Sequence, residues 1–164
     1  MDDSALSDGT IRELLLSTRR VAVVGASANP ARPSYGVTGF LVARGYDVTP
    51  VNPGHAGQSI QGRRVVARLD DAAPLDLVDL FRASEHVLAP VRDAIRLGAR
   101  AVWMQLGVVD EQAAAEARAA GLAVVIDRCP KIEWYRLGLP GSVVEAEQSA
   151  RQSHQPSPVP GAPG

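Results

Sequence analysis

The residues best suited to chemistry lie in one loop, at positions 24–37, between an apolar run and a helical pattern. Gly25 allows a sharp turn and a close approach of a ligand to the backbone, and the free N–H groups of a helix start attract an anion. Ser27 and Ser34 add hydroxyl donors, and Arg32 adds a planar cation suited to phosphate. The loop therefore predicts phosphate binding. In the alternative interpretation Gly25 is a plain turn residue and Ser34 a helix cap.

The loop departs from the G-x-G-x-x-G fingerprint of NAD-binding sites. Gly25 matches its first glycine, but Ser27 and Pro30 stand where the second and third are expected. The next predicted strand, 47–51, continues into Asn52 and offers no carboxylate for ribose hydroxyls. These two departures disfavour NAD as the ligand. The prolines around this strand exit, Pro50 and Pro53, would form an apolar ledge for an adenine, or they would simply end the strand.

Other reactive side chains are few. The chain has three histidines and one cysteine, and these are His55, His86, His154 and Cys129. Such scattered residues make neither a metal site nor a catalytic set. We therefore expect no catalytic residue and no metal ion.

A repeated unit of apolar run, turn, helical pattern and glycine positions these loops. Strands are predicted at 20–24, 47–51, 77–81, 101–104 and 123–126, with a short edge at 64–66. Helices are predicted near 35–44, 91–97 and 111–120, after a short leading helix capped by Ser7 or Asp8. Strands that are apolar on both faces need helices on both sides. The predicted fold class is α/β, a doubly wound, Rossmann-like, mostly parallel sheet of five or six strands, whose ligands bind beyond the carboxyl ends of the strands.

Length and composition describe one soluble domain. The 164 residues include 17 Lys and Arg against 18 Asp and Glu, so a net charge of -1 argues against nucleic acid as a partner. No apolar stretch is long enough to span a membrane, and the single cysteine fits a reducing compartment, so we expect a cytoplasmic protein. We expect the domain at 1–147 and a disordered, proline-rich tail at 148–164.

Seven short sequence motifs follow one another along the chain in a characteristic order. They are 24–30, 32–35, 45–53, 81–82, 98–100, 103–107 and 127–129. Together they resemble the stand-alone CoA-binding domain family, which is similar to the CoA-binding domain of the succinyl-CoA synthetase α subunit and of the NDP-forming acyl-CoA synthetases. The resemblance covers residues 15–137.

The resemblance implies CoA or a short acyl-CoA as ligand, and a place for each of its parts. The diphosphate would lie at the first loop, the adenosine at the second strand exit, and the pantetheine arm beyond the third main strand. The implied contacts are Gly25, Ala26, Ser27, Asn29, Pro30, Arg32, Ser34, Tyr35, Pro50, Val51, Asn52, Pro53, His55, Phe81, Arg82, Met104 and Gln105.

Two positions leave alternatives open. In the synthetases a lysine of the second-strand loop meets the nucleotide end of CoA, and His55 stands closest to it here, with Arg63 or Arg64 as substitutes. Cys129 lies near basic residues that would lower the pKa of its thiol and favour a mixed disulfide with CoA. Alternatively, Cys129 packs at a strand end.

The length leaves no room for the ATP-binding and phosphohistidine domains of the synthetases. The sequence therefore predicts a small CoA-binding protein that is not itself an enzyme, with a second copy or a partner enzyme as the other partner to be considered. Two alternatives stay open. One is a redox enzyme or sensor domain that binds NAD(H), and the other is a regulatory interaction module that has kept the fold but lost the ligand.

Overall fold

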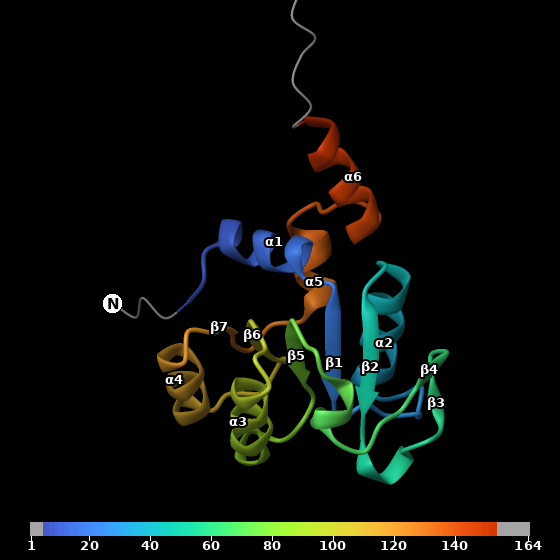
Figure 1. Ribbon diagram of the computed structural model, residues 1–164, viewed down its shortest axis with the longest axis vertical. Coiled ribbons are helices and arrows are strands. Elements are labelled where there is room, and N and C mark those ends of the chain that lie inside the picture. Colours follow the sequence, from blue (N-terminus) through green and yellow to red (C-terminus); the bar gives the residue numbers. More distant parts are fainter. Residues whose placement is uncertain (1–4, 154–164) are drawn as a thin grey trace, which may run out of the picture.

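The computed structural model describes residues 5–153, and a parallel sheet of five strands forms its centre. The strands are β1 (Arg20–Val24), β2 (Asp47–Val51), β5 (Leu77–Leu80), β6 (Ala101–Met104) and β7 (Ala123–Val125), in the order β2-β1-β5-β6-β7 (Figure 1). The α/β, Rossmann-like fold that the sequence predicts is therefore confirmed. All strand pairs of this sheet are parallel, so their carboxyl ends lie at one edge.

Helices cover both faces of the sheet. Neighbouring residues along a strand point to opposite faces, and both sets of residues are apolar, so each face needs a cover. Val21 and Val23 belong to one core cluster with residues of α1 (Asp8–Ser17), α2 (Pro33–Ala43) and α5 (Pro130–Arg136). Ala22, which lies between these two valines and points to the other face of the sheet, belongs to a second core cluster. That cluster contains residues of α3 (Leu88–Arg96) and α4 (Glu111–Ala119). The sheet is thus the middle layer of three.

The strand order reverses at β1. The chain leaves β1 for β2 on one side and returns to β5 on the other, and Val24 is in register with both Val51 and Leu80. Loops that follow β1 and β5 therefore part in opposite directions at the carboxyl edge. A crevice at such a switch point is where doubly wound sheets bind ligands.

The edge strand predicted at 64–66 is only partly correct. A turn at Gln61 and Gly62, both with positive φ, folds β3 (Ser59–Ile60) and β4 (Arg63–Arg64) into an antiparallel hairpin apart from the main sheet. Val66 then lies beside β2 in a single parallel bridge to Val51. Short 3-10 helices complete the connections, namely η1 (Pro53–His55), η2 (Leu69–Ala72) and η3 (Ser84–His86).

The tail expected from residue 148 is wrong over 148–153, because α6 (Val143–Ser153) continues through these positions (Figure 1). The helix is held at its start by buried Val143, whose N–H donates to the Arg44 carbonyl at 2.8 Å. Glu147 then accepts hydrogen bonds from Arg19 and Arg151. These contacts stabilise a segment whose own composition is polar. Residues 154–164 of the predicted tail lie outside the described residues.

Candidate functional site

Gly25 occupies a position that no other residue type fits. Its φ is +83°, and a Cβ there would lie 2.3 Å from the main-chain oxygen of Phe81. Its N–H donates to the carbonyl of Val51 at 3.0 Å. The ends of β1, β2 and β5 therefore meet at this glycine, which leaves the backbone of the first loop open to a ligand.

The first loop is shaped by its own side chains. The Ser27 hydroxyl accepts from the N–H of Asn29 at 3.1 Å, and the Asn29 carboxamide accepts from the N–H of Ala31 at 3.0 Å. The main-chain N–H of Arg32 donates to the carbonyl of Asn29. Ser27 and Asn29, which the sequence assigns to the ligand, thus also set the conformation of the loop.

The start of α2 has no side-chain cap. Arg32 is the N-cap residue and makes no capping hydrogen bond, and Pro33 has no N–H to satisfy. The N–H of Tyr35 donates to the carbonyl of Arg32 at 3.1 Å, so Ser34 supplies the N–H of this first turn that an anion can meet, and the helix dipole favours an anion there. A pocket of about 300 Å³ lies at this point. It is lined by Gly25, Ala26, Ser27, Arg32, Pro33, Ser34, Asn52 and Phe81.

Asn52 joins the second-strand exit to the first loop. Its Nδ2 donates to the carbonyl of Ala26 at 2.8 Å, and its Oδ1 accepts from the N–H of Gly54 at 2.9 Å. The side chain expected beside the adenosine therefore holds two loops together. Pro50 is buried within β2, and the Nδ1 atom of His55 lies 3.2 Å from Oε1 of Gln58.

A second pocket, of about 210 Å³, lies between the exit of β2, residues 67–70 and the start of α3. Its lining residues are Val24, Val51, Pro53, Ala67, Arg68, Leu69, Asp70, Arg82, Ala89, Pro90 and Asp93. Arg82 connects it to the first loop, because its Cδ would lie 3.1 Å from a Cβ at Gly25. Arg82 also lines a shallower hollow of about 590 Å³ along η3 and α3.

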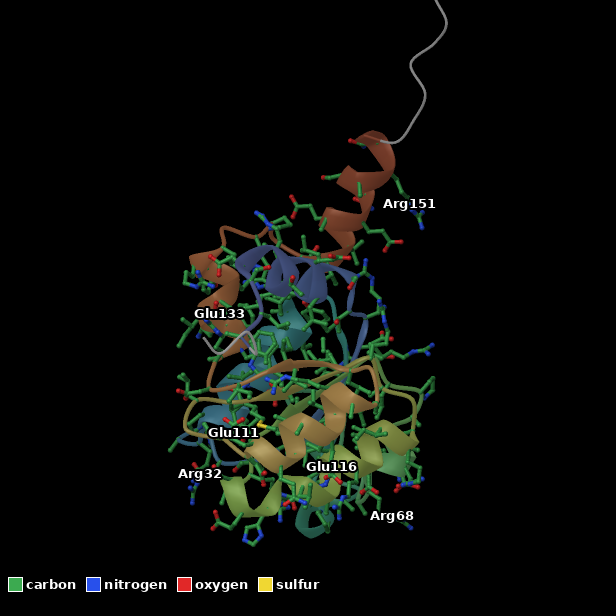
Figure 2. All side chains as sticks on the ribbon, turned by 90° about the vertical axis from the view of Figure 1, so that its left-hand side faces the viewer. Arg32, Arg68, Glu111, Glu116, Glu133 and Arg151 are labelled. Carbon is green, nitrogen blue, oxygen red and sulfur yellow. The ribbon has the colours of Figure 1, made fainter. Side chains whose placement is uncertain are left out.

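Arg68 is a cation of this edge that the sequence analysis missed. Figure 2 shows Arg32 and Arg68 at the same end of the molecule, the end to which the strands point. Arg63, proposed from the sequence as a substitute cation, lies 3.6 Å from Asp47, the first residue of β2, and so belongs to the opposite edge of the sheet. The sequence signal for the position of Arg68 was the apolar pair 65–66, which can lie beside β2. If this pair runs parallel to β2, the residues that follow it leave the sheet at its carboxyl edge, where the ligand is expected.

A buried pair of polar side chains, Gln105 and Asp79, lies in the region of the protein where the far end of the ligand is expected. Met104 is fully buried among residues of α3 and α4, and Gln105, which follows it, is 4% exposed. The Nε2 of Gln105 donates to Oδ1 of Asp79 at 2.6 Å. Asp79 is fully buried in β5, between Val23 and Trp103 in register, and burial raises the pKa of its carboxyl to about 7. Asp79 lies in an otherwise apolar strand, and the sequence pattern predicts no role for it.

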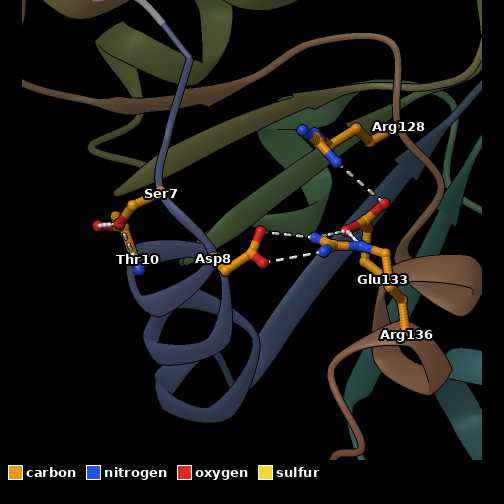
Figure 3. Close-up of polar contacts among 6 residues, drawn as sticks. All are labelled: Ser7, Asp8, Thr10, Arg128, Glu133 and Arg136. Carbon is orange, nitrogen blue, oxygen red and sulfur yellow. Dashed lines mark hydrogen bonds and ion pairs between the residues drawn. The ribbon is translucent and has the colours of Figure 1, made fainter.

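Cys129 is buried at the start of α5, in the core cluster on the α2 face. Its neighbour Arg128 donates to the buried carboxylate of Glu133 at 3.2 Å. Arg136 bridges Glu133 to Asp8 at the start of α1 (Figure 3). The cation beside the thiol is therefore engaged elsewhere, and the surroundings of Cys129 favour the packing interpretation.

Comparison with known proteins identifies the family of the chain. A family model described as a CoA binding domain matches residues 19–135. The chain belongs to this family. A relative in Bacillus subtilis (strain 168), the uncharacterized protein YneT, is 33% identical over 127 residues, which make up 77% of this chain and 93% of YneT. The family match supports CoA as the ligand at the level of the domain.

Solved structures of similar chains share the fold of this chain. A hypothetical protein from Pyrococcus horikoshii OT3 is 36% identical with a TM-score of 0.78, over 84% of this chain and 96% of that one. A Thermus thermophilus protein is 34% identical with a TM-score of 0.76, over 80% of this chain and 99% of that one. Within residues 5–153, no helix has the length and apolar character to cross a membrane, and no cluster of three metal-ligand side chains occurs.

Proposed function

We propose that this protein binds CoA with the diphosphate at the first loop. The observation that carries the proposal is the uncapped start of α2 beside Gly25, where Ser34 and the exposed Arg32 line one pocket. A diphosphate is rich in acceptor oxygens and negative charge, and an N–H at a helix start together with a guanidinium complements both. The family match makes CoA the ligand to be expected there.

The other parts of CoA then have natural directions. The adenosine extends toward the exit of β2, where Val51 and Pro53 supply apolar wall to the second pocket. The pantetheine arm extends past Phe81 toward Gln105, across the ends of β5 and β6. Leu106 follows in the same loop with its side chain 58% exposed, and this apolar surface at the end of the arm suits a short acyl group.

We further propose that the chain binds this ligand without transforming it. The two reactive side chains nearest the expected end of the arm, Asp79 and Cys129, are buried in the core. In the described part of the chain, neither side chain is exposed to a ligand as a nucleophile or as a base. The proposed role is therefore to hold CoA or a short acyl-CoA, in a reducing cytoplasm, for a partner enzyme or as a sensor of the ligand.

Titration calorimetry of the full chain with CoA and with NADH tests the proposal. We expect saturable binding of CoA with one site per chain and no heat above dilution with NADH. Binding of NADH alone would favour the NAD(H)-binding alternative, and the absence of binding by both ligands would favour the ligand-free module. Thermal unfolding gives a second measure, because CoA at 100 times its Kd raises the stability by about 2.7 kcal/mol.

A further inference from the structure

Arg68 stands at the ligand edge, on the wall of the second pocket. Val66 lies parallel to β2, with its carbonyl accepting from the N–H of Asn52 at 2.9 Å, and the chain leaves the sheet directly afterwards. Two residues later Arg68 faces the same pocket as Val51 and Pro53. This is the pocket toward which the adenosine of the proposed ligand extends.

We propose that Arg68 and Arg82 form a subsite for the 3′-phosphate of CoA. The inference rests on the proposed function, since it extends the same site to a second anionic group of the same ligand. It assigns to these two residues the choice between CoA and nucleotides that share its adenosine diphosphate but lack the 3′-phosphate.

The donors of Arg68 are available to an anion. Its side chain is 73% exposed, and its nearest carboxylate in residues 5–153, that of Asp70, lies 3.7 Å away, beyond hydrogen-bond distance. Asp70 instead accepts two hydrogen bonds from Arg96, at 2.9 and 3.1 Å, and these lower the pKa of Asp70. Arg96 also donates to Asp93 at 3.3 Å. The two carboxylates of the pocket thus take their hydrogen bonds from a third arginine, and Arg68 keeps its own N–H donors for a phosphate beside a long ion pair to Asp70.

Arg82 supplies the second cation. It is exposed, lines the same pocket and forms no ion pair with any residue of the described part of the chain. Its aliphatic stem lies beside Gly25, so the residue adjoins the diphosphate loop and the second pocket together. Two guanidinium groups on one pocket suit a phosphate dianion, which each can meet with paired N–H donors.

Two of the other cations named from the sequence, Arg63 and His55, are less well placed. Arg63 lies against Asp47 at the opposite edge of the sheet. The imidazole of His55 is near Gln58 and lines neither the first-loop pocket nor the second. Arg68 therefore replaces, from a different segment, the lysine that the related synthetases carry after their second strand.

Calorimetry with CoA and 3′-dephospho-CoA tests the subsite in the full chain. We expect the unaltered protein to bind CoA at least about tenfold more tightly than 3′-dephospho-CoA, as charge-assisted hydrogen bonds to one phosphate would give. Arg68→Gln should weaken the binding of CoA about tenfold and leave the affinity for 3′-dephospho-CoA unchanged. Arg82→Gln should act in the same direction. Arg63→Gln, the control at a cation on the opposite edge of the sheet, should change neither affinity.

Three results separate the outcomes. Equal affinity of the unaltered protein for both ligands would overturn the subsite and leave the proposed function intact. If Arg68→Gln weakens the binding of CoA and of 3′-dephospho-CoA to the same extent, the subsite is also overturned, because the effect would then not depend on the 3′-phosphate. If neither ligand binds the unaltered protein, the proposed function fails, and this subsite fails with it.

Discussion

Gln105 donates a 2.6 Å hydrogen bond from its side-chain amide to the carboxyl of Asp79, in the interior of the sheet. Only one oxygen of this carboxyl has a partner in the described structure, because Oδ2 of Asp79 makes no hydrogen bond there. A charge in such surroundings is costly, and burial therefore raises the pKa of Asp79 from 3.8 to about 7. The pair links the loop after β6 to the centre of β5.

The first prediction concerns stability and pH. Between pH 3.8 and about 7 the folded protein keeps a proton on Asp79 that the unfolded chain releases. The stability that this group contributes is therefore present below pH 3.8 and is lost as the pH rises toward 7. Asp79→Asn removes this titration. Relative to the unaltered protein, the variant should gain up to about 4 kcal/mol over that range.

Urea unfolding at several pH values measures this difference. The comparison uses the change with pH rather than the absolute stability, because the new amide introduces an unpaired donor of its own. A stability difference between the two proteins that stays constant from pH 4 to pH 8 would contradict the raised pKa.

The second prediction concerns charge at the first loop. Ser27→Asp places a carboxylate where the proposed diphosphate lies, and repulsion should weaken CoA binding about tenfold or more, on the order of 1.4 kcal/mol. Ser59→Asp is the control, since Ser59 is an exposed serine of β3 that lines none of the pockets described above. Equal CoA affinity of the two variants by calorimetry would remove the loop from the site.

The third prediction concerns the ion-pair network that joins α5 to α1 (Figure 3). The Glu133 side chain is 6% exposed and accepts hydrogen bonds from Arg128 and Arg136. Glu133→Leu leaves both guanidinium groups without their buried partner, and we expect a loss of about 2 kcal/mol in unfolding free energy. Asp8→Asn alters the exposed end of the same network and should cost much less.

CoA affinity provides the second measurement for this network. The Glu133 side chain lies away from the first-loop and second pockets, so the affinity should not change in the folded variant. If Glu133→Leu and Asp8→Asn lose the same stability, burial of the carboxylate is not what makes the network matter.

Much of this fold follows from local patterns. The bounds of β1 and β2 are those predicted, because each is a short apolar or β-branched run that ends at a turn residue. The first loop is predictable for a similar reason, since a glycine between a strand and a helix start limits what the backbone can do there.

The rest depends on contacts between distant segments. Arg68 reaches the ligand edge only because Val66 pairs with Val51, and no local pattern specifies that register. The helix α5 escapes prediction because it has seven residues, and burial of Trp134 against Phe40 and Tyr46 stabilises it more than its own sequence does. Asp79 is unexpected because an acid in a buried strand departs from the pattern of the strand itself.

The last prediction concerns the backbone at Gly25. In Gly25→Ala the new methyl group would meet the Phe81 carbonyl at 2.3 Å, and φ of +83° disfavours any side chain, so β1 and β5 must separate or the loop must change. We expect a loss of at least about 2 kcal/mol in stability and of CoA binding. Gly36→Ala, inside α2 with nothing within 4 Å of the added carbon, should instead stabilise the protein by about 0.5–1 kcal/mol. Urea unfolding that ranks the two variants in the opposite order would show that the loop does not need a glycine, and the proposed approach of the diphosphate to the backbone would lose its basis.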